Sequence, residues 1–266
     1  MKNFIKFILN QLDLDIHRKS LYESADDPIK VLEILFKNNG LSTIIDGGAS
    51  IGTITRRFCD TFKDARIYAF EPYQPHFDTL QEVANNNKRI IPVKKGLSNK
   101  NENQSLFLNQ SSGTNSLLRA TKQGQAIYGD QLKEIGQTEV ECTTLDHYLQ
   151  SKEIESVDIL KLDLQGGELD ALDGASKTLE EGKINCILCE MMLESHYQNQ
   201  PSAGRLLHSL IEKYGFSLFN LYQLHHHHGR FIYADALFVL PSFLESITKK
   251  LPLQFHPHSK LPIHFP

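Results

Sequence analysis

The sequence predicts an α/β protein built on a doubly wound, mostly parallel sheet. Short apolar runs that suit buried strands alternate along the chain with stretches of helical apolar spacing. Three of these apolar runs end in an acid, at Asp46, Glu71 and Asp163. Ligands of such sheets bind at the carboxyl ends of the strands, so the acids mark a candidate site. With 266 residues, 40% of them hydrophobic, the chain is long enough to bury one large core.

The elements are expected in an alternating order along most of the chain. The expected strands lie near 43–47, 66–71, 90–95, 105–108, 138–142, 157–163, 184–190, 216–222 and 231–239. The expected helices lie near 3–11, 27–38, 51–62, 74–86, 144–150, 168–181 and 202–214. Residues 98–136 are polar and rich in Asn, Gln, Ser and Gly, which predicts an irregular insertion around the short strand 105–108.

The loop after the first strand favours a ligand that carries no phosphate. It begins with Asp46, continues through Gly47, Gly48 and Ala49, and ends with Gly52. Small residues let a ligand approach the main chain, and the following helix offers unpaired N–H groups. A dinucleotide fingerprint lacks the leading acid, which would repel a pyrophosphate. S-adenosylmethionine (SAM) instead carries an ammonium and a sulfonium. The loop therefore favours a methyltransferase, with a nicotinamide-dependent oxidoreductase as the alternative.

The second acid, Glu71, fits a role in binding a ribose. In α/β nucleotide folds an acid at the end of the second strand accepts hydrogen bonds from ribose hydroxyls. Pro72 fixes the chain just beyond Glu71 and favours an extended conformation there. Asp163 ends the run 157–162, which is apolar enough for a central strand, and is the third candidate site residue.

These motifs and others in the same order resemble the FkbM family of methyltransferases, a branch of the class I SAM-dependent enzymes. The resemblance covers roughly residues 40–240. The matching positions are 46–52, 70–72 with Phe77 and Leu80, 140–146, 160–168 and 172–175. Gly47 and Ser50 differ from the residues that the family usually has.

The resemblance implies a seven-stranded sheet with an antiparallel last strand and SAM as the cofactor. It implies adenine beside Gly96 and Leu97, and Asp46 through Gly52 with Glu71 and Pro72 around the rest of SAM. The implied acceptor is a small molecule, often a hydroxyl of a sugar or natural product. N-methylation and a non-catalytic SAM-binding or interaction module are the alternatives. The sequence leaves the acceptor and the oligomeric state open.

Methylation of a hydroxyl needs a group that removes a proton, and the sequence offers four candidates. They are Asp163, Glu190 at the end of the strand 184–190, His196 just beyond it, and His225 in the run His225–His228. A histidine is suited to this role near neutral pH. Asp235 interrupts an apolar run, where a carboxylate is costly to bury unless it is paired. We expect it to meet Arg230 or a site group, or to lie on an exposed face.

The histidine run has a plainer interpretation as the polar turn of a hairpin between the last two strands. Four adjacent histidines in an extended segment cannot all face one metal ion, so no metal site is predicted. The four cysteines include Cys186 and Cys189 in an apolar run, where they are expected to be core thiols rather than a redox or zinc pair.

Composition argues against several other classes of protein. A net charge of −4 gives no general attraction to nucleic acid. There is no apolar run of the length that crosses a membrane, and no cleavage site follows the apolar N-terminus, so a cytoplasmic location is expected. The expected organisation is a helical extension at 1–39, a methyltransferase domain at 40–241 and an extended tail at 242–266, of which 251–266 holds four prolines.

Overall fold

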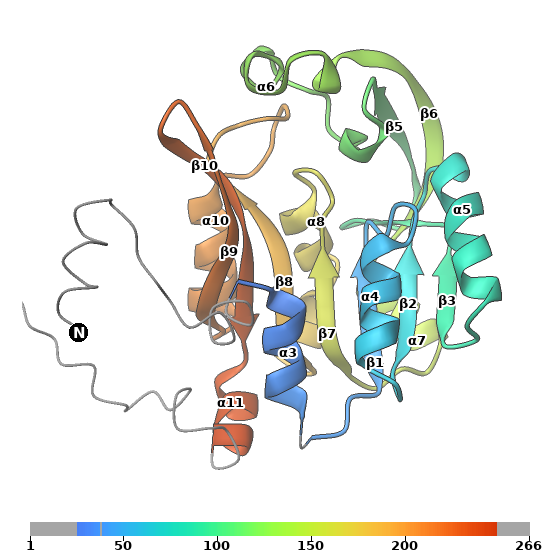
Figure 1. Cartoon of the computed structure of the whole chain (residues 1–266), viewed down its shortest axis with the longest axis vertical. Coiled ribbons are helices and arrows are strands. Elements are labelled where there is room, and N and C mark those ends of the chain that lie inside the picture. The colour runs from blue at the N-terminus through green and yellow to red at the C-terminus, as the bar shows by residue number, and fades with distance from the viewer. Residues whose placement is uncertain (1–25, 38, 249–266) are drawn as a thin grey trace, which may run out of the picture.

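The computed structural model describes residues 26–37 and 39–248, and its main sheet has the predicted α/β architecture (Figure 1). In the described residues this sheet has seven strands in the order β3-β2-β1-β7-β8-β10-β9. The strands are β1 Thr43–Gly47, β2 Arg66–Phe70, β3 Ile90–Val93, β7 Val157–Leu162, β8 Ile184–Met192, β9 Ser217–His227 and β10 Arg230–Val239. Strand β10 runs antiparallel to both of its neighbours, while the pairs from β3 to β8 are parallel. The predicted fold is therefore confirmed.

Both faces of the sheet are covered, which explains why its central strands read as continuous apolar runs. Successive side chains of a strand point to opposite faces, so Ile44 packs in one core and Ile45 in the other. The helices on the face of Ile44 are α3 Pro28–Phe36, α4 Thr53–Thr61 and α11 Pro241–Thr248, with α5 Gln74–Asn85 alongside. The opposite face holds α7 Leu145–Ser151, α8 Glu168–Asp173, α9 Ser176–Glu180, α10 Ala203–Leu207 and the π-helix η3 His208–Lys213.

The polar insertion folds into an ordered cap. A second sheet, of order β4-β6-β5, is made by β4 Gly96–Leu97, β5 Asn103–Asn109 and β6 Glu134–Thr143. The segment between β5 and β6 contains η1 Ser112–Thr114, α6 Lys122–Tyr128 and η2 Gly129–Leu132. Figure 1 shows this cap above the carboxyl ends of the central strands. It is tied to the loop after β8, where the Thr121 N–H donates to the His196 carbonyl oxygen at 2.8 Å. The strands expected at 105–108 and 138–142 are confirmed as β5 and β6, whereas the helical segments between them were not predicted.

Two predicted segments differ from the structure. The helix expected at 168–181 is divided into α8 and α9 around Gly174, where the main chain of the cap approaches so closely that an added Cβ would lie 2.1 Å from the Ser98 carbonyl oxygen. The extended tail expected from residue 242 was wrong for its first part, since 241–248 form α11. The Phe243 ring stacks on Phe36 of α3 with the ring centroids 4.7 Å apart, and this apolar contact stabilises the helix.

The structure also tests the predictions for the N-terminal segment, the cysteines and the last hairpin. Helix α3 is part of the core through the fully buried Leu32, and the helix expected at 3–11 lies outside the described residues. All four cysteines are buried free thiols, as expected. The β9–β10 hairpin turns at His228 and Gly229, whose φ angles of 48° and 77° suit the twist of a two-residue hairpin. No helix in residues 26–37 and 39–248 is long and apolar enough to cross a membrane.

Candidate active site

A cavity lies at the carboxyl ends of β1, β2 and β7, under the cap, and its empty space, open solvent included, is about 700 Å³. Six of the predicted site residues line it, namely Gly48, Glu71, Pro72, Gly96, Leu97 and Asp163. The cap contributes Leu106, Leu117 and the η1 segment. Among residues 26–37 and 39–248, the lining contains two carboxylates, Glu71 and Asp163, and no Lys or Arg.

Glu71 is fixed by two main-chain donors at the rim of this cavity. One carboxylate oxygen accepts the Ser50 N–H at 2.8 Å, and the other accepts the Tyr73 N–H at 2.8 Å. Each oxygen keeps a free lone pair, so the carboxylate remains able to accept two further hydrogen bonds. Burial raises the pKa of Glu71 to about 7, although the two N–H donors act in the opposite direction.

The glycine loop holds its shape through the main chain. The N–H groups of Gly48 and Ala49 both donate to the Phe70 carbonyl oxygen, at 3.1 and 2.9 Å. Gly48 and Gly52 have φ angles of +71° and +84°, which side chains other than glycine rarely adopt. Gly47 packs beneath Leu97, and Ala49 is buried against α5. Of the loop residues predicted to bind the cofactor, Gly48 lines the cavity. Gly47, Ala49 and Gly52 do not line it and lie behind its wall.

Asp46, which the sequence predicted to bind the cofactor, is fully buried and is not among the residues that line this cavity. Its carboxylate accepts a hydrogen bond from the Thr55 hydroxyl at 2.6 Å and forms an ion pair with the Lys161 ammonium at 3.1 Å. This internal pairing neutralises the charge that was expected to attract a cationic ligand. The carboxylates that do line the cavity, Glu71 and Asp163, are the groups that would attract a cationic ligand.

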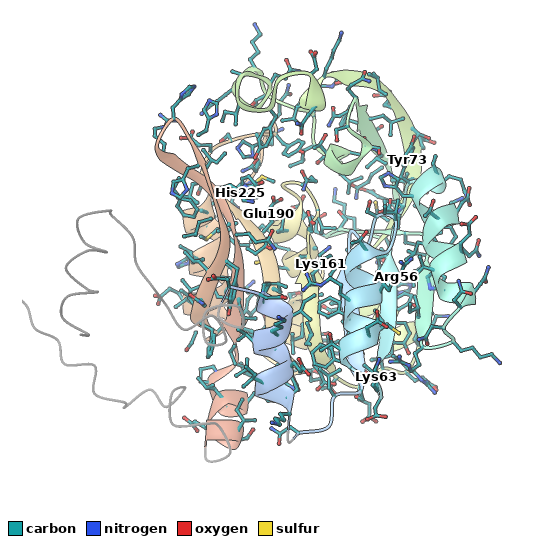
Figure 2. The ribbon with its side chains drawn as sticks, in the orientation of Figure 1. Arg56, Lys63, Tyr73, Lys161, Glu190 and His225 are labelled. Carbon is teal, nitrogen blue, oxygen red and sulfur yellow. The ribbon has the colours of Figure 1, made fainter. Side chains whose placement is uncertain are left out.

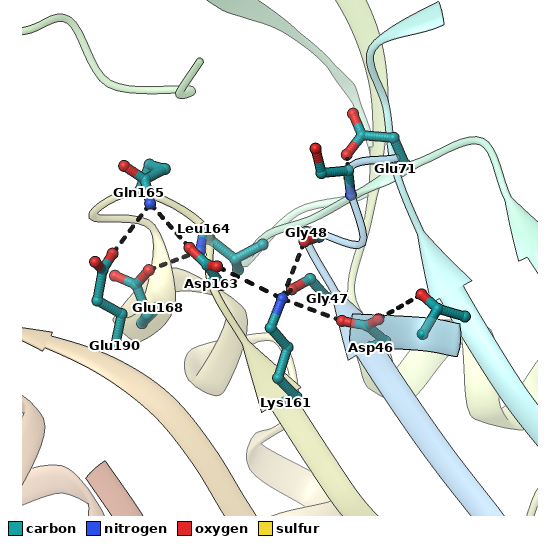
Figure 3. A network of polar contacts seen from close by, with 12 residues as sticks. Asp46, Gly47, Gly48, Glu71, Lys161, Asp163, Leu164, Gln165, Glu168 and Glu190 are labelled. Atoms are coloured by element: carbon teal, nitrogen blue, oxygen red, sulfur yellow. Dashed lines mark hydrogen bonds and ion pairs between the residues drawn. The ribbon is translucent and has the colours of Figure 1, made fainter. Parts of the chain in front are cut away.

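Lys161 is a central residue that the sequence interpretation missed. Its ammonium group donates to the carbonyl oxygens of Gly47 and Gly48, at 3.2 and 3.0 Å, and lies 3.7 Å from an oxygen of Asp163 (Figure 3). The side chain is buried, and neighbouring carboxylates outweigh the burial that opposes its charge, so the pKa of Lys161 is raised. The available signal was a lysine inside the central strand, two residues before Asp163.

A second cavity, of about 740 Å³, adjoins the first and shares Asp163 and Gln165 with it. It lies between the first turns of α3 and α4 and the ends of β7, β8 and β10. The polar side chains in its lining are Arg57, Lys161, Asp163, Gln165, Glu190, Gln223, His225, Tyr233 and Asp235. Figure 2 shows Lys161, Glu190 and His225 in one region of the molecule, from the central strands to the β9–β10 hairpin. The structure therefore brings three of the four predicted catalytic candidates, Asp163, Glu190 and His225, to one cavity.

Hydrogen bonds from Gln165 connect the two cavities. Its amide nitrogen donates to Asp163 at 2.8 Å and to Glu190 at 3.1 Å, while its amide oxygen accepts the Tyr197 hydroxyl at 2.8 Å. Behind this turn, the Glu168 carboxylate accepts the Leu164 N–H at 2.7 Å. Burial raises the pKa of Glu168 to about 7. Glu168 therefore fixes the turn that carries Asp163 and Gln165, in addition to beginning α8.

His196, the fourth candidate, is not among the residues that line these two cavities. It is buried beneath the cap with its ring edge-to-face against Tyr128, the centroids being 5.0 Å apart. His225 is exposed at the rim, and its ring stacks on Tyr233 with a centroid distance of 4.0 Å. Burial lowers the pKa of both histidines. Within the described residues, no group of three or more His, Cys, Asp or Glu side chains is placed to hold a metal ion.

The fold has the seven-stranded sheet with an antiparallel last strand that the methyltransferase resemblance implied, and the two cavities adjoin at the carboxyl end of β7. The FkbM methyltransferase domain matches residues 46–218, which is more than half of the chain. The chain therefore belongs to the FkbM methyltransferase family, as the sequence motifs predicted.

Curated relatives are also methyltransferases by name. Methyltransferase 1 of Beauveria bassiana is 28% identical over 144 residues, which cover 50% of this chain and 58% of the relative. The hexuronic acid methyltransferase AglP of Haloferax volcanii is 27% identical over 151 residues, which cover 55% of this chain and 54% of the relative. The match thus spans somewhat more than half the length of each relative. An rRNA methylase structure from Streptococcus thermophilus aligns with a TM-score of 0.45 and 14% identity, over 80% of this chain and 97% of that one.

Proposed function

We propose that the protein transfers the methyl group of SAM to a hydroxyl of a small molecule, a sugar or a natural product. The observation that supports this most strongly is the pair of cavities that meet at Asp163 and Gln165. A donor in the first cavity and an acceptor in the second would meet at those two residues. Holding two reactants in line is the main contribution that a protein makes to such a transfer, about 7–11 kcal/mol in favourable cases.

The chemistry of the first cavity fits SAM. Phe70, Leu97 and Leu106 supply apolar surface for an adenine, and the free lone pairs of Glu71 suit the two hydroxyls of a ribose. Asp163 and the absence of Lys and Arg from the lining favour a ligand that carries positive charge and no phosphate. When bound, SAM supplies an activated methyl group. The same features disfavour a dinucleotide, whose pyrophosphate would lie close to carboxylates.

Replacing Glu71 should weaken donor binding and change its pH dependence. The ionised carboxylate is the form that accepts ribose hydroxyls, and the pKa of Glu71 is raised to about 7. Affinity for S-adenosylhomocysteine should therefore be at its maximum above pH 7. Below pH 7 it should fall about tenfold per pH unit, because the proton on Glu71 must be removed before the ligand binds. Glu71→Gln should lose about 10–100-fold in affinity at pH 8 and show a flatter profile. Calorimetry from pH 5.5 to 8 measures both, with the exposed Glu139→Gln as control; an unchanged affinity would refute the assignment.

The second cavity suits a polyhydroxyl acceptor. Its lining combines carboxylates and the amides of Gln165 and Gln223 with the rings of His225 and Tyr233. These two rings are stacked with their centroids 4.0 Å apart. Such groups accept hydrogen bonds from hydroxyls and pack against the apolar faces of a ring. The name of the Haloferax volcanii relative, a hexuronic acid methyltransferase, also supports a sugar as the acceptor class.

Ligand-induced stabilisation provides the first test of this function. A ligand that binds only the native state raises the melting temperature, and at a hundred times its Kd it adds about 2.7 kcal/mol. SAM and S-adenosylhomocysteine should both shift the melting temperature, whereas NAD should not. A shift with NAD and none with SAM would overturn the proposal. Transfer of a labelled methyl group to a panel of methyl glycosides then tests the acceptor class directly.

A further inference from the structure

We propose that Asp235 is the proton acceptor for the methylated hydroxyl and that Glu190 is its protonated partner. This inference rests on the proposed function and assigns the base within the second cavity. Asp235 of β10 and Glu190 of β8 are directly opposite each other in the antiparallel register of the two strands. Both side chains line the second cavity. The sequence suggested Arg230 as one partner for Asp235, but in the structure Arg230 pairs with Glu194.

Two carboxylates at directly opposed positions of a sheet disfavour each other when both are ionised. Under this proposal the pair keeps one proton between its members, because ionisation of one carboxylate disfavours ionisation of the other. Such a pair combines an ionised group, which can accept a proton, with a neutral one, which can donate a hydrogen bond. These are the two properties that a site for a reacting hydroxyl needs.

The charges around the pair decide which member keeps the proton. Glu190 is influenced by Asp163, Glu168 and Asp235, which all disfavour its ionised form, and burial raises the pKa of Glu190 well above its usual value. For Asp235, burial and then Asp163 raise the pKa while the Lys161 ammonium lowers it, and the pKa is raised to about 6. The surroundings therefore favour Asp235 as the member that ionises and Glu190 as the member that keeps the proton.

The other charged or titratable groups that face this cavity leave the assignment unchanged. Arg57 on α4 is already paired with Asp27 at 2.6 Å. His225 on β9 lies at the exposed rim, with its ring stacked on Tyr233 of β10. The pKa of Tyr233 is raised by burial, so this hydroxyl remains protonated near neutral pH. Asp163 receives a hydrogen bond from Gln165 and shares the Lys161 charge with Asp46.

The transfer balances with these groups alone. The hydroxyl oxygen of the acceptor forms its bond to the methyl carbon as the carbon–sulfur bond of the donor breaks. The sulfonium leaves as the neutral thioether S-adenosylhomocysteine. The O–H bond of the acceptor breaks, and its proton passes to the Asp235 carboxylate, which later releases it to solvent. One positive charge on sulfur and one negative charge on Asp235 disappear together.

The test has one arm that needs no acceptor. Carbon-13 NMR of the carboxyl groups, with S-adenosylhomocysteine bound, follows the titrations of Asp235 and Glu190. Because the ionised Asp235 disfavours the ionised Glu190, Asp235→Asn should lower the pKa of Glu190 by about one unit or more, as expected for interacting sites. Asp130→Asn, at an exposed residue of the cap, is the control and should leave it unchanged. A Glu190 titration that Asp235→Asn does not alter would overturn the pairing.

The second arm measures transfer from methyl-labelled SAM to methyl glycosides of neutral hexoses and of hexuronates. Asp235→Asn should slow transfer by about 10²–10⁴-fold while calorimetry shows S-adenosylhomocysteine binding at wild-type affinity. Glu190→Gln keeps a neutral partner and should cost much less. Transfer by Asp235→Asn at the wild-type rate would overturn the base assignment. If the wild type methylates no glycoside, the proposed acceptor class fails, while the NMR arm still decides on the carboxylate pair.

Discussion

Gly48→Ala is expected to abolish donor binding and to lower the free energy of unfolding by about 2–5 kcal/mol. Two effects act together at this position. The φ angle of +71° is strained for any residue with a side chain, and a Cβ at Gly48 would lie 2.0 Å from the Asp163 carbonyl oxygen. That oxygen belongs to the main chain of β7's carboxyl end, so relief requires the glycine loop and the Asp163 turn to separate. Both line the donor cavity.

Chemical denaturation and calorimetry with S-adenosylhomocysteine measure the two consequences of Gly48→Ala. Gly136→Ala is a matched control, because a Cβ at Gly136 has no neighbour within 4 Å and its φ is not positive. The control should retain donor affinity and change stability by much less. Wild-type stability and affinity in Gly48→Ala would show that the two loops are not in the contact described.

Lys161→Met is expected to have the second large effect, a loss of about 3–5 kcal/mol in the free energy of unfolding. The substitution leaves the Asp46 carboxylate, which is fully buried, without its counter-ion. It also removes the donor to the Gly47 and Gly48 carbonyl oxygens, so the glycine loop loses two hydrogen bonds that fix its position. Donor affinity should fall together with stability.

A double variant separates the buried charge from the lost support. Asp46→Asn combined with Lys161→Met removes both charges, so no uncompensated carboxylate remains in the core. Its stability, measured by urea denaturation, should exceed that of Lys161→Met alone. Donor affinity should remain below the wild-type value, because the two loop carbonyl oxygens still lack their donor. Strictly additive effects of the two substitutions would contradict the pairing.

The donor half of the site could be predicted from sequence because its signals are local. Glu71 and Asp163 each follow an apolar strand, and Gly48 lies in a short loop of recognisable composition. The ion pair of Asp46 could not be predicted, because its partner, Lys161, is on a strand more than a hundred residues away. No sequence spacing reports that pairing. The cavity still favours a cationic ligand, because the carboxylates of Glu71 and Asp163 line it.

The acceptor half was harder to predict because it depends on strand register and on tertiary contacts. Asp235 and Glu190 become a pair only through the antiparallel register of β10 and β8, which the composition of neither strand fixes. His196 looked suitable beyond a strand end, yet the cap covers it. Two strands of the cap were expected, but its helical segments η1, α6 and η2 were not, since its polar composition predicts irregular structure between them. The break between α8 and α9 was also not predicted, and it lies where Gly174 closely approaches the cap.

The two cavities have different walls, and this separation has a consequence for evolution. The donor wall is built from β1, β2 and β7, whereas His225, Tyr233 and Gln223 come from the β9–β10 hairpin, whose segment 223–226 is exposed. Substitutions in that exposed segment touch no part of the donor frame. Acceptor preference can therefore diverge through changes in one hairpin while the methyl-donating apparatus is inherited intact.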